Sequence, residues 1–367
     1  MLPSQHTEAP RDGSLFGELR ALLHEHECPS AWMWQAVTSL LDVAPREELD
    51  AMVAYVKSFT DRWASAGTMA ALWGVSAELA SPEDDGRALD SSWENGIQGE
   101  LRVAPSHWVG ELYQGVASPK FELVHALDLG SSNLGSAAVE KILQHPQLDN
   151  LTHLVTAVGK APSKKLLATL CTPPLLDQIE YLRLSSAGTK FEPWLVEVGS
   201  EPGALRALDV SQYHASLTWE CLDAPYLRDI ETLGMWGYQF QVFMQKRMKR
   251  VTHLILHGVS FKVVARALAE PQFYEPLKTL RVANYHSADW KSFFELDFQG
   301  SLDLLDISQP IPYQRDNMLR YNGKALQKLM LHSPLLERVT AIKLGPWRER
   351  LDEDAILEVH PHLTILT

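Results

Sequence analysis

The stretch from Val124 to Leu154 reads VHALDLGSSNLGSAAVEKILQHPQLDNLTHL and combines two spacings of apolar residues. It opens with VHALDL, in which apolar residues occupy offsets 0, 3 and 5, a pattern written LxxLxL. The segment from Ser136 to Leu148 then has the spacing of an amphipathic helix. The stretch closes by starting a weaker copy of the first pattern at Leu151, 27 residues after Val124. It therefore predicts a repeat built from one strand and one helix.

The same pattern recurs through most of the chain. Clear copies start at Val124, Ile179, Leu205, Ile230, Val251, Leu277, Leu302 and Val339, degenerate copies start at Gln98 and Leu151, and LTIL ends the chain at 363–366. Most intervals between starts are 21 to 28 residues, with one of 37 before Val339. A unit of this size cannot bury its apolar face alone, so neighbouring units must stack into a solenoid.

These copies resemble leucine-rich repeats of the longer, helix-containing kind found in ribonuclease inhibitor, over roughly residues 97–367. Asn95 to Leu129 also resembles bacterial leucine-rich repeat proteins that carry a small helical segment before the solenoid. The resemblance implies a right-handed α/β horseshoe with a parallel sheet on its concave face. It also implies binding of other macromolecules on that face, usually without chemistry.

The rest of the chain divides by composition. We expect a disordered start over 1–13, a helical bundle over 14–80, an acidic linker over 81–96 and the solenoid over 97–367. The bundle has helical spacing in LFGELRALL, AWMWQAVTSLL, EELDAMVAYVKSF and MAALW. It fits either a cap on the first repeat or a separate adaptor domain. The long interval predicts an insertion near 310–338, with a helix from about Lys324 to Leu331.

Charge, hydropathy and cysteine content argue against several classes of protein. The net charge is −13, and residues 1–100 hold 17 acidic against 6 basic residues. This disfavours nucleic acid, whose binders carry a basic stripe. There is neither an apolar run long enough for a membrane span nor a secretory leader, and three distant cysteines signal no disulfide framework. We expect a bacterial cytoplasmic protein.

Motifs for catalysis and metal binding are weak. HEHEC places His24 and Cys28 on one helix face, but no second ligand cluster accompanies them. His253 and His257 lie on one face of a predicted strand, roughly 13 Å apart, too far to share a metal. Nucleophile elbows, phosphate loops and dinucleotide fingerprints are missing from the sequence. We expect no enzymatic activity and no cofactor.

The predicted strands offer a better candidate site. Side chains at offsets 2, 4 and 6 of each repeat point away from the apolar core, because successive residues of a strand alternate between faces. The offset-4 positions are Asp128, Val155, Arg183, Asp209, Gly234, Ile255, Arg281, Asp306 and Lys343. From all three offsets we predict a partner-binding site of Tyr181, Arg183, Asp209, Trp236, His253, His257, Arg281 and Asp306. In the competing interpretation, the charges only satisfy one another across neighbouring strands.

A Tyr-His pair occurs shortly after the LxxLxL pattern in two repeats, those that start at Leu205 and Leu277. Tyr213 and Tyr285 fall at offset 8, where the family favours an inward asparagine, so we expect them to be buried. His214 and His286, one position later, are predicted on the rim of the binding surface.

The sequence thus favours non-catalytic recognition of a protein through the concave face. An inhibitor or immunity protein for a cognate toxin or enzyme is one alternative. An enzyme that selects substrates with its repeats is another. The oligomeric state and the identity of the partner stay open.

Overall fold

The structure of the chain is a computed structural model. The structure describes residues 14–25, 31–65, 106–129, 134–157, 164–170, 175–185, 203–210, 227–237, 240, 250–270, 275–285, 290–310 and 323–366. They form an α/β protein with a ten-stranded, all-parallel sheet in chain order, β1 to β10. Expected segments 1–13 and 81–96, the Gln98 copy and MAALW lie outside the described residues.

The strands fall where the LxxLxL copies predict them. They are β1 (Ala126–Leu129), β2 (His153–Ala157), β3 (Tyr181–Ser185), β4 (Ala207–Asp209), β5 (Thr232–Trp236), β6 (His253–His257), β7 (Thr279–Tyr285), β8 (Leu302–Pro310), β9 (Val339–Lys343) and β10 (Thr364–Leu366). Before β1 the chain forms α5 (Ser106–Gln114) and the 3-10 turn η2 (Pro119–Leu123). Between the strands lie the helices and 3-10 turns α6 (Ser136–Leu143), α7 (Lys164–Leu170), α8 (Leu175–Gln178), α12 (Phe261–Leu268), α14 (Trp290–Phe294), α16 (Gly323–Leu331), η6 (Leu336–Arg338), η7 (Gly345–Arg350) and α17 (Glu353–Val359).

The chain divides into two compact units. The first comprises 1–128 with 140–153, and the second comprises 129–139 with 154–367. In the first unit, three of the four expected N-terminal helices are confirmed as α1 (Leu15–Glu25), α2 (Ala31–Val43) and α3 (Arg46–Ser65). They pack against one another, and α3 also contacts η2. The first unit therefore includes the three helices together with the segment that leads into β1.

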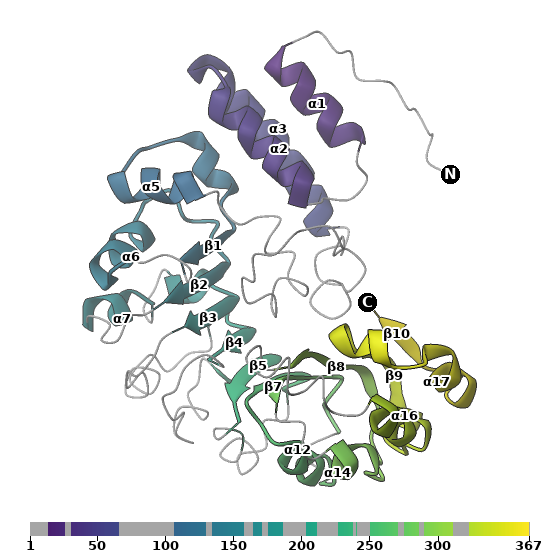
Figure 1. The fold of residues 1–367 in the computed structure, drawn as a ribbon. Helices are drawn as coiled ribbons and strands as arrows, with labels where there is room; N and C mark the ends of the chain where they lie inside the picture. The colour runs from purple at the N-terminus through teal and green to yellow at the C-terminus, as the bar shows by residue number, and fades with distance from the viewer. Residues whose placement is uncertain are drawn as a thin grey trace. The chain divides into compact units, whose positions relative to one another are not determined.

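The second unit stacks its helices in chain order along one side of the sheet (Figure 1). Helix α12 contacts α14, α14 contacts α16, and α16 contacts α17. The rings of Phe261 and Trp290 stack with centroids 4.3 Å apart, and both side chains are fully buried. Trp290 therefore packs in the apolar core of this unit. The helix expected from Lys324 to Leu331 is confirmed as α16.

Buried apolar residues at offsets 0, 3 and 5 form the core between sheet and helices. In the β6 repeat these are Val251, Leu254 and Leu256, each at most 2% exposed. Ser260 caps α12 by accepting a hydrogen bond from the Lys262 backbone N–H at 3.2 Å. Helix α12 ends at Leu268, three residues before Pro271, which cannot continue a helix.

Candidate functional site

One register position of the sheet collects charged side chains from successive strands. Backbone pairing aligns Arg183 with Asp209, Asp209 with Gly234, Gly234 with Ile255, Ile255 with Arg281, Arg281 with Asp306, and Asp306 with Lys343. We call these seven residues of β3 to β9 the charge row. All of them belong to the second unit. Parallel strands lie about 4.8 Å apart, so side chains at one register pack against their neighbours.

Two ion pairs lie within the charge row. The Nε atom of Arg183 lies 3.4 Å from Oδ2 of Asp209, and Nε of Arg281 lies 3.2 Å from Oδ2 of Asp306. Arg281 and Asp306 therefore pair across neighbouring strands, as the competing interpretation predicted for these charges. Asp209, however, pairs with Arg183 on the preceding strand.

Gly234 makes room for the first pair. A Cβ at this position would lie 2.3 Å from Oδ1 and 2.7 Å from Cγ of Asp209. The Asp209 carboxylate therefore extends over the Gly234 backbone, and it is fully buried there. Any side chain at position 234 would displace the carboxylate.

Most of the predicted site is less accessible than the sequence suggested. Tyr181, Arg183, Asp209, His257, Arg281 and Asp306 are each at most 9% exposed. These six side chains are therefore buried rather than open on the face of the sheet. Their role in partner binding stays a prediction.

Trp236 and His253 are the two predicted site residues that are half-buried. Trp236 ends β5 and lies against the next repeat at Gly258, where a Cβ would come within 2.7 Å of the indole ring. Gly258 also has a φ of +61°, which favours glycine. Burial lowers the pKa of His253 and the charge of Lys278 adds to this effect, which outweighs the opposing charges of Glu231 and Asp303.

The pairing register between β7 and β8 also differs from the one that a simple count of offsets gives. Counting offsets along one strand places Ser308 beside Ala283, but Ala283 pairs with Gln309 because the register between β7 and β8 shifts there. Asp306 Oδ1 accepts hydrogen bonds from the Ser308 backbone N–H at 2.9 Å and from its hydroxyl at 2.6 Å. The two hydrogen bonds between Ser308 and Asp306 lie next to the register shift between β7 and β8. The rim residues His214 and His286 lie outside the described residues, as does Tyr213.

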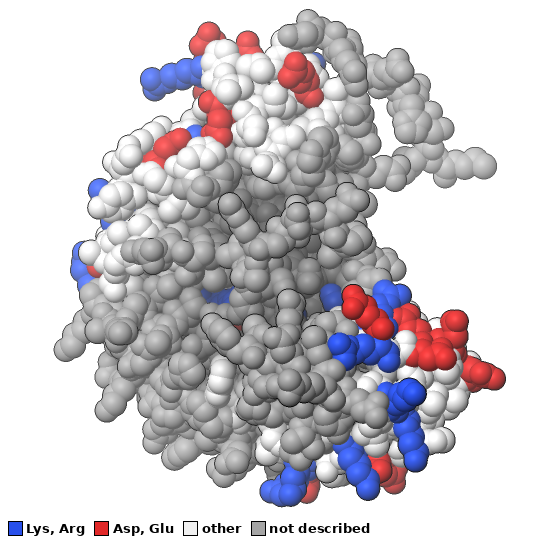
Figure 2. Space-filling view, viewed as in Figure 1, with Lys and Arg blue, Asp and Glu red and all other residues white. Residues whose placement is uncertain are grey.

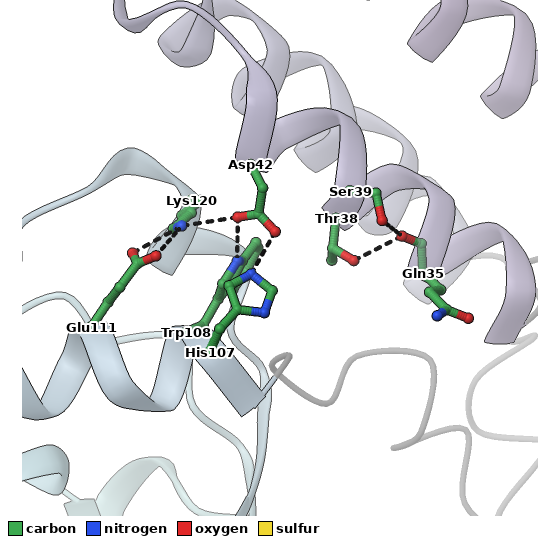
Figure 3. Close-up of polar contacts among 8 residues, drawn as sticks. All are labelled: Gln35, Thr38, Ser39, Asp42, His107, Trp108, Glu111 and Lys120. Atoms are coloured by element: carbon green, nitrogen blue, oxygen red, sulfur yellow. Dashed lines mark hydrogen bonds and ion pairs between the residues drawn. The ribbon is translucent and has the colours of Figure 1, made fainter.

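The first unit contains a polar network that the sequence did not reveal (Figure 3). Asp42, near the end of α2, accepts hydrogen bonds from Trp108 Nε1 at 2.7 Å, Lys120 Nζ at 3.0 Å and His107 Nε2 at 2.5 Å. Lys120 also bonds Glu111 at 2.9 Å. We call these five residues the Asp42 network.

The Asp42 network stabilises a carboxylate in an unfavourable place. The C-terminal end of a helix carries partial negative charge, which disfavours an acid there. Burial raises the pKa of Asp42, but the hydrogen bonds from Trp108, Lys120 and His107 outweigh burial and leave the pKa below its ordinary value. Trp108 is fully buried and Lys120 is 6% exposed. The network therefore serves to join α2 to α5 and η2.

The other candidate groups give little indication of a metal site or a catalytic site. His24 of the HEHEC run bonds the Tyr55 hydroxyl at 2.9 Å, while Cys28 lies outside the described residues. Within the described ranges, no group of three metal-ligating side chains and no helix long and apolar enough to span a membrane is found. Acidic and basic side chains alternate around α16 and α17 (Figure 2), where Arg348 bonds Glu353.

Comparisons with known proteins add no family assignment. No protein-family model matches the chain, and no curated protein is significantly similar to it in sequence. The class that fold and site define is an α/β protein with a parallel sheet in chain order and a charge row across it.

Proposed function

We propose that this chain is a leucine-rich repeat protein that recognises a protein partner without catalysis. In this proposal the strands and helices form a right-handed solenoid, and the sheet face bearing the charge row contacts the partner. The bacterial cytoplasm is the proposed compartment. The internal repeat pattern and the strand order in the sheet support the family assignment.

The alignment of charged side chains at one register of the sheet is the observation that carries this proposal. Arg183, Asp209, Arg281, Asp306 and Lys343 are at most 9% exposed, and buried ion pairs contribute little net stability compared with apolar residues of similar volume. Their presence is thus poorly explained by folding alone. Recognition explains it better, because charges held in fixed positions select a partner of complementary charge.

The accessible anchors next to the charge row are Trp236 and His253. Tryptophan is enriched among residues that dominate binding energy, and Trp236 is held in place by its contact with Gly258. Arg281 is a poorer test position, because Arg281→Glu would place a second buried carboxylate beside Asp306 and disturb the fold.

Affinity capture with the full chain tests the proposal. Trp236→Ala and His253→Ala should each reduce recovery of a specific partner about tenfold or more, as expected for anchor residues. Lys291→Ala on α14, whose side chain is 76% exposed, is the matched control and should leave recovery unchanged. Circular dichroism verifies folding of each variant. Equal recovery with the wild type and both anchor variants would contradict recognition through this face.

A further inference from the structure

The charge row is unbalanced at its β7–β9 end. Arg183 and Asp209 form a neutral pair, whereas Arg281, Asp306 and Lys343 together carry two positive charges and one negative charge. One cation at this end therefore has no counterpart within the row. This excess lies on a chain whose net charge is −13.

The Asp306 carboxylate is already engaged by other groups. Its Oδ1 atom accepts two hydrogen bonds from Ser308, and its Oδ2 atom faces Arg281 Nε at 3.2 Å. Asp306 affects the Lys343 ammonium through its charge, but the two do not come within ion-pair distance. The Asp306 carboxylate therefore interacts mainly with Arg281 and leaves the Lys343 ammonium without a bonded counter-charge.

Lys343 is left nearly buried with an unneutralised charge. Its side chain is 8% exposed, and among the described residues it makes no hydrogen bond and no ion pair. Burial lowers the pKa of Lys343 and Arg281 adds to this effect, while Asp306 opposes it. A buried ammonium without a bonded counter-charge is costly, so an arriving anion would relieve that cost.

We propose that Lys343 receives a carboxylate of the protein partner, from an aspartate or glutamate side chain. This inference rests on the proposed function and specifies its chemistry. A single carboxylate would bring the triad of Arg281, Asp306 and Lys343 to neutrality. A dianionic phosphate would overcompensate the triad and lie against the Asp306 carboxylate, which the charge pattern disfavours.

Lysine-specific acetylation kinetics on the full chain test this inference. The free chain is labelled at several pH values in about 0.15 M salt, which screens exposed charges beyond about 8 Å, and each lysine is followed by mass spectrometry. An oligoglutamate peptide is the probe, with oligoglutamine of equal length as the neutral control. Inorganic phosphate at equal ionic strength is the third arm. Lys291 on the surface of α14 is the internal reference.

The expected result is selective protection of Lys343 by oligoglutamate. A carboxylate that raises the pKa of the ammonium by about one unit decreases the free amine about tenfold, while Lys291 changes little. No protection, equal protection by oligoglutamine, protection by phosphate alone, or failure of Lys343 to react in the free chain would each overturn the inference.

Two variants complete the test. Labelled oligoglutamate should lose binding to Lys343→Met and retain it with Lys343→Arg, which keeps the positive charge. Lys343→Met should fold, since it replaces a buried charge by an apolar side chain of similar length. If both variants bind the peptide as the wild type does, Lys343 is not the receptor. Loss of partner capture in Trp236→Ala would still support recognition of a partner in that case. The proposed function and the role of Lys343 can therefore be rejected independently of each other.

Discussion

At the scale of single residues, the most connected polar group is Asp42. It sits near the C-terminal end of α2, where the helix dipole opposes a carboxylate, yet three donors from the α5 and η2 region keep it ionised. One of these donors, Lys120, is buried and shares its charge with Glu111. The network is therefore a structural junction whose strength depends on the charge of Asp42.

Asp42→Asn should destabilise the protein by about 2 to 3 kcal/mol, because it removes a charged acceptor from a partly buried group of donors. The folded-state pKa of Asp42 lies below its ordinary value, so its contribution is present above pH 4 or so and is lost as the pH falls through the lowered pKa. Denaturant unfolding at several pH values measures the difference. It should be full near neutral pH and shrink in acid.

Asp50→Asn provides the matched control for this prediction. Asp50 is exposed on α3 and makes no hydrogen bond or ion pair among the described residues, so its substitution should change stability by less than about 0.5 kcal/mol. A gap between wild type and Asp42→Asn that stays constant into strong acid would show that lost packing, not charge, is responsible.

At the scale of elements, the charge row depends on a glycine between two strands. Gly234→Ala should destabilise β4 and β5 by about 1 to 3 kcal/mol, since the new Cβ overlaps the Asp209 carboxylate and forces it from Arg183. Adding Asp209→Ala should recover part of the loss, because the overlap disappears. Chemical denaturation of the single and double variants measures this coupling.

Gly110→Ala serves as the contrasting substitution. A Cβ at Gly110, inside α5, meets nothing within 4 Å, so alanine should stabilise the helix by about 0.5 to 1 kcal/mol. Equal effects at positions 110 and 234 would mean that the close approach of Asp209 to Gly234 does not constrain the sheet.

The sequence predicted the strands well because their signal is local. Each LxxLxL copy contains the apolar residues that bury its own strand, so β2 was placed even from the degenerate copy at Leu151. Burial of the charge row was not predictable in this way, since the spacing within one repeat does not show which other parts of the chain lie against a charged side chain. The Asp42 network was missed because its donors lie 65 to 78 residues away along the chain. Lys343 stood at the same offset as Arg281, and only the ion pair between Arg281 and Asp306 distinguished the two cations.

At the scale of the whole molecule, the strand order limits how a local defect spreads. In the sheet each strand pairs with the strands that precede and follow it in sequence, so β6 pairs with β5 and β7. The helices of the second unit contact one another in the same order. Stability in such an array is approximately a sum of repeat terms and nearest-neighbour terms. A defect in one repeat should therefore weaken its neighbours more than distant strands.

Leu254→Ala tests this expectation. Leu254 is fully buried in β6, and truncation should cost about 3 kcal/mol through lost apolar contact and the cavity left behind. Native-state hydrogen exchange should then accelerate most for the amides of β5, β6 and β7, and least for β9 and β10. Val359→Ala on α17, where the side chain is 50% exposed, should leave exchange unchanged. If Leu254→Ala accelerates exchange equally in all the described strands, the second unit unfolds as a single cooperative block and the nearest-neighbour account of this sheet fails.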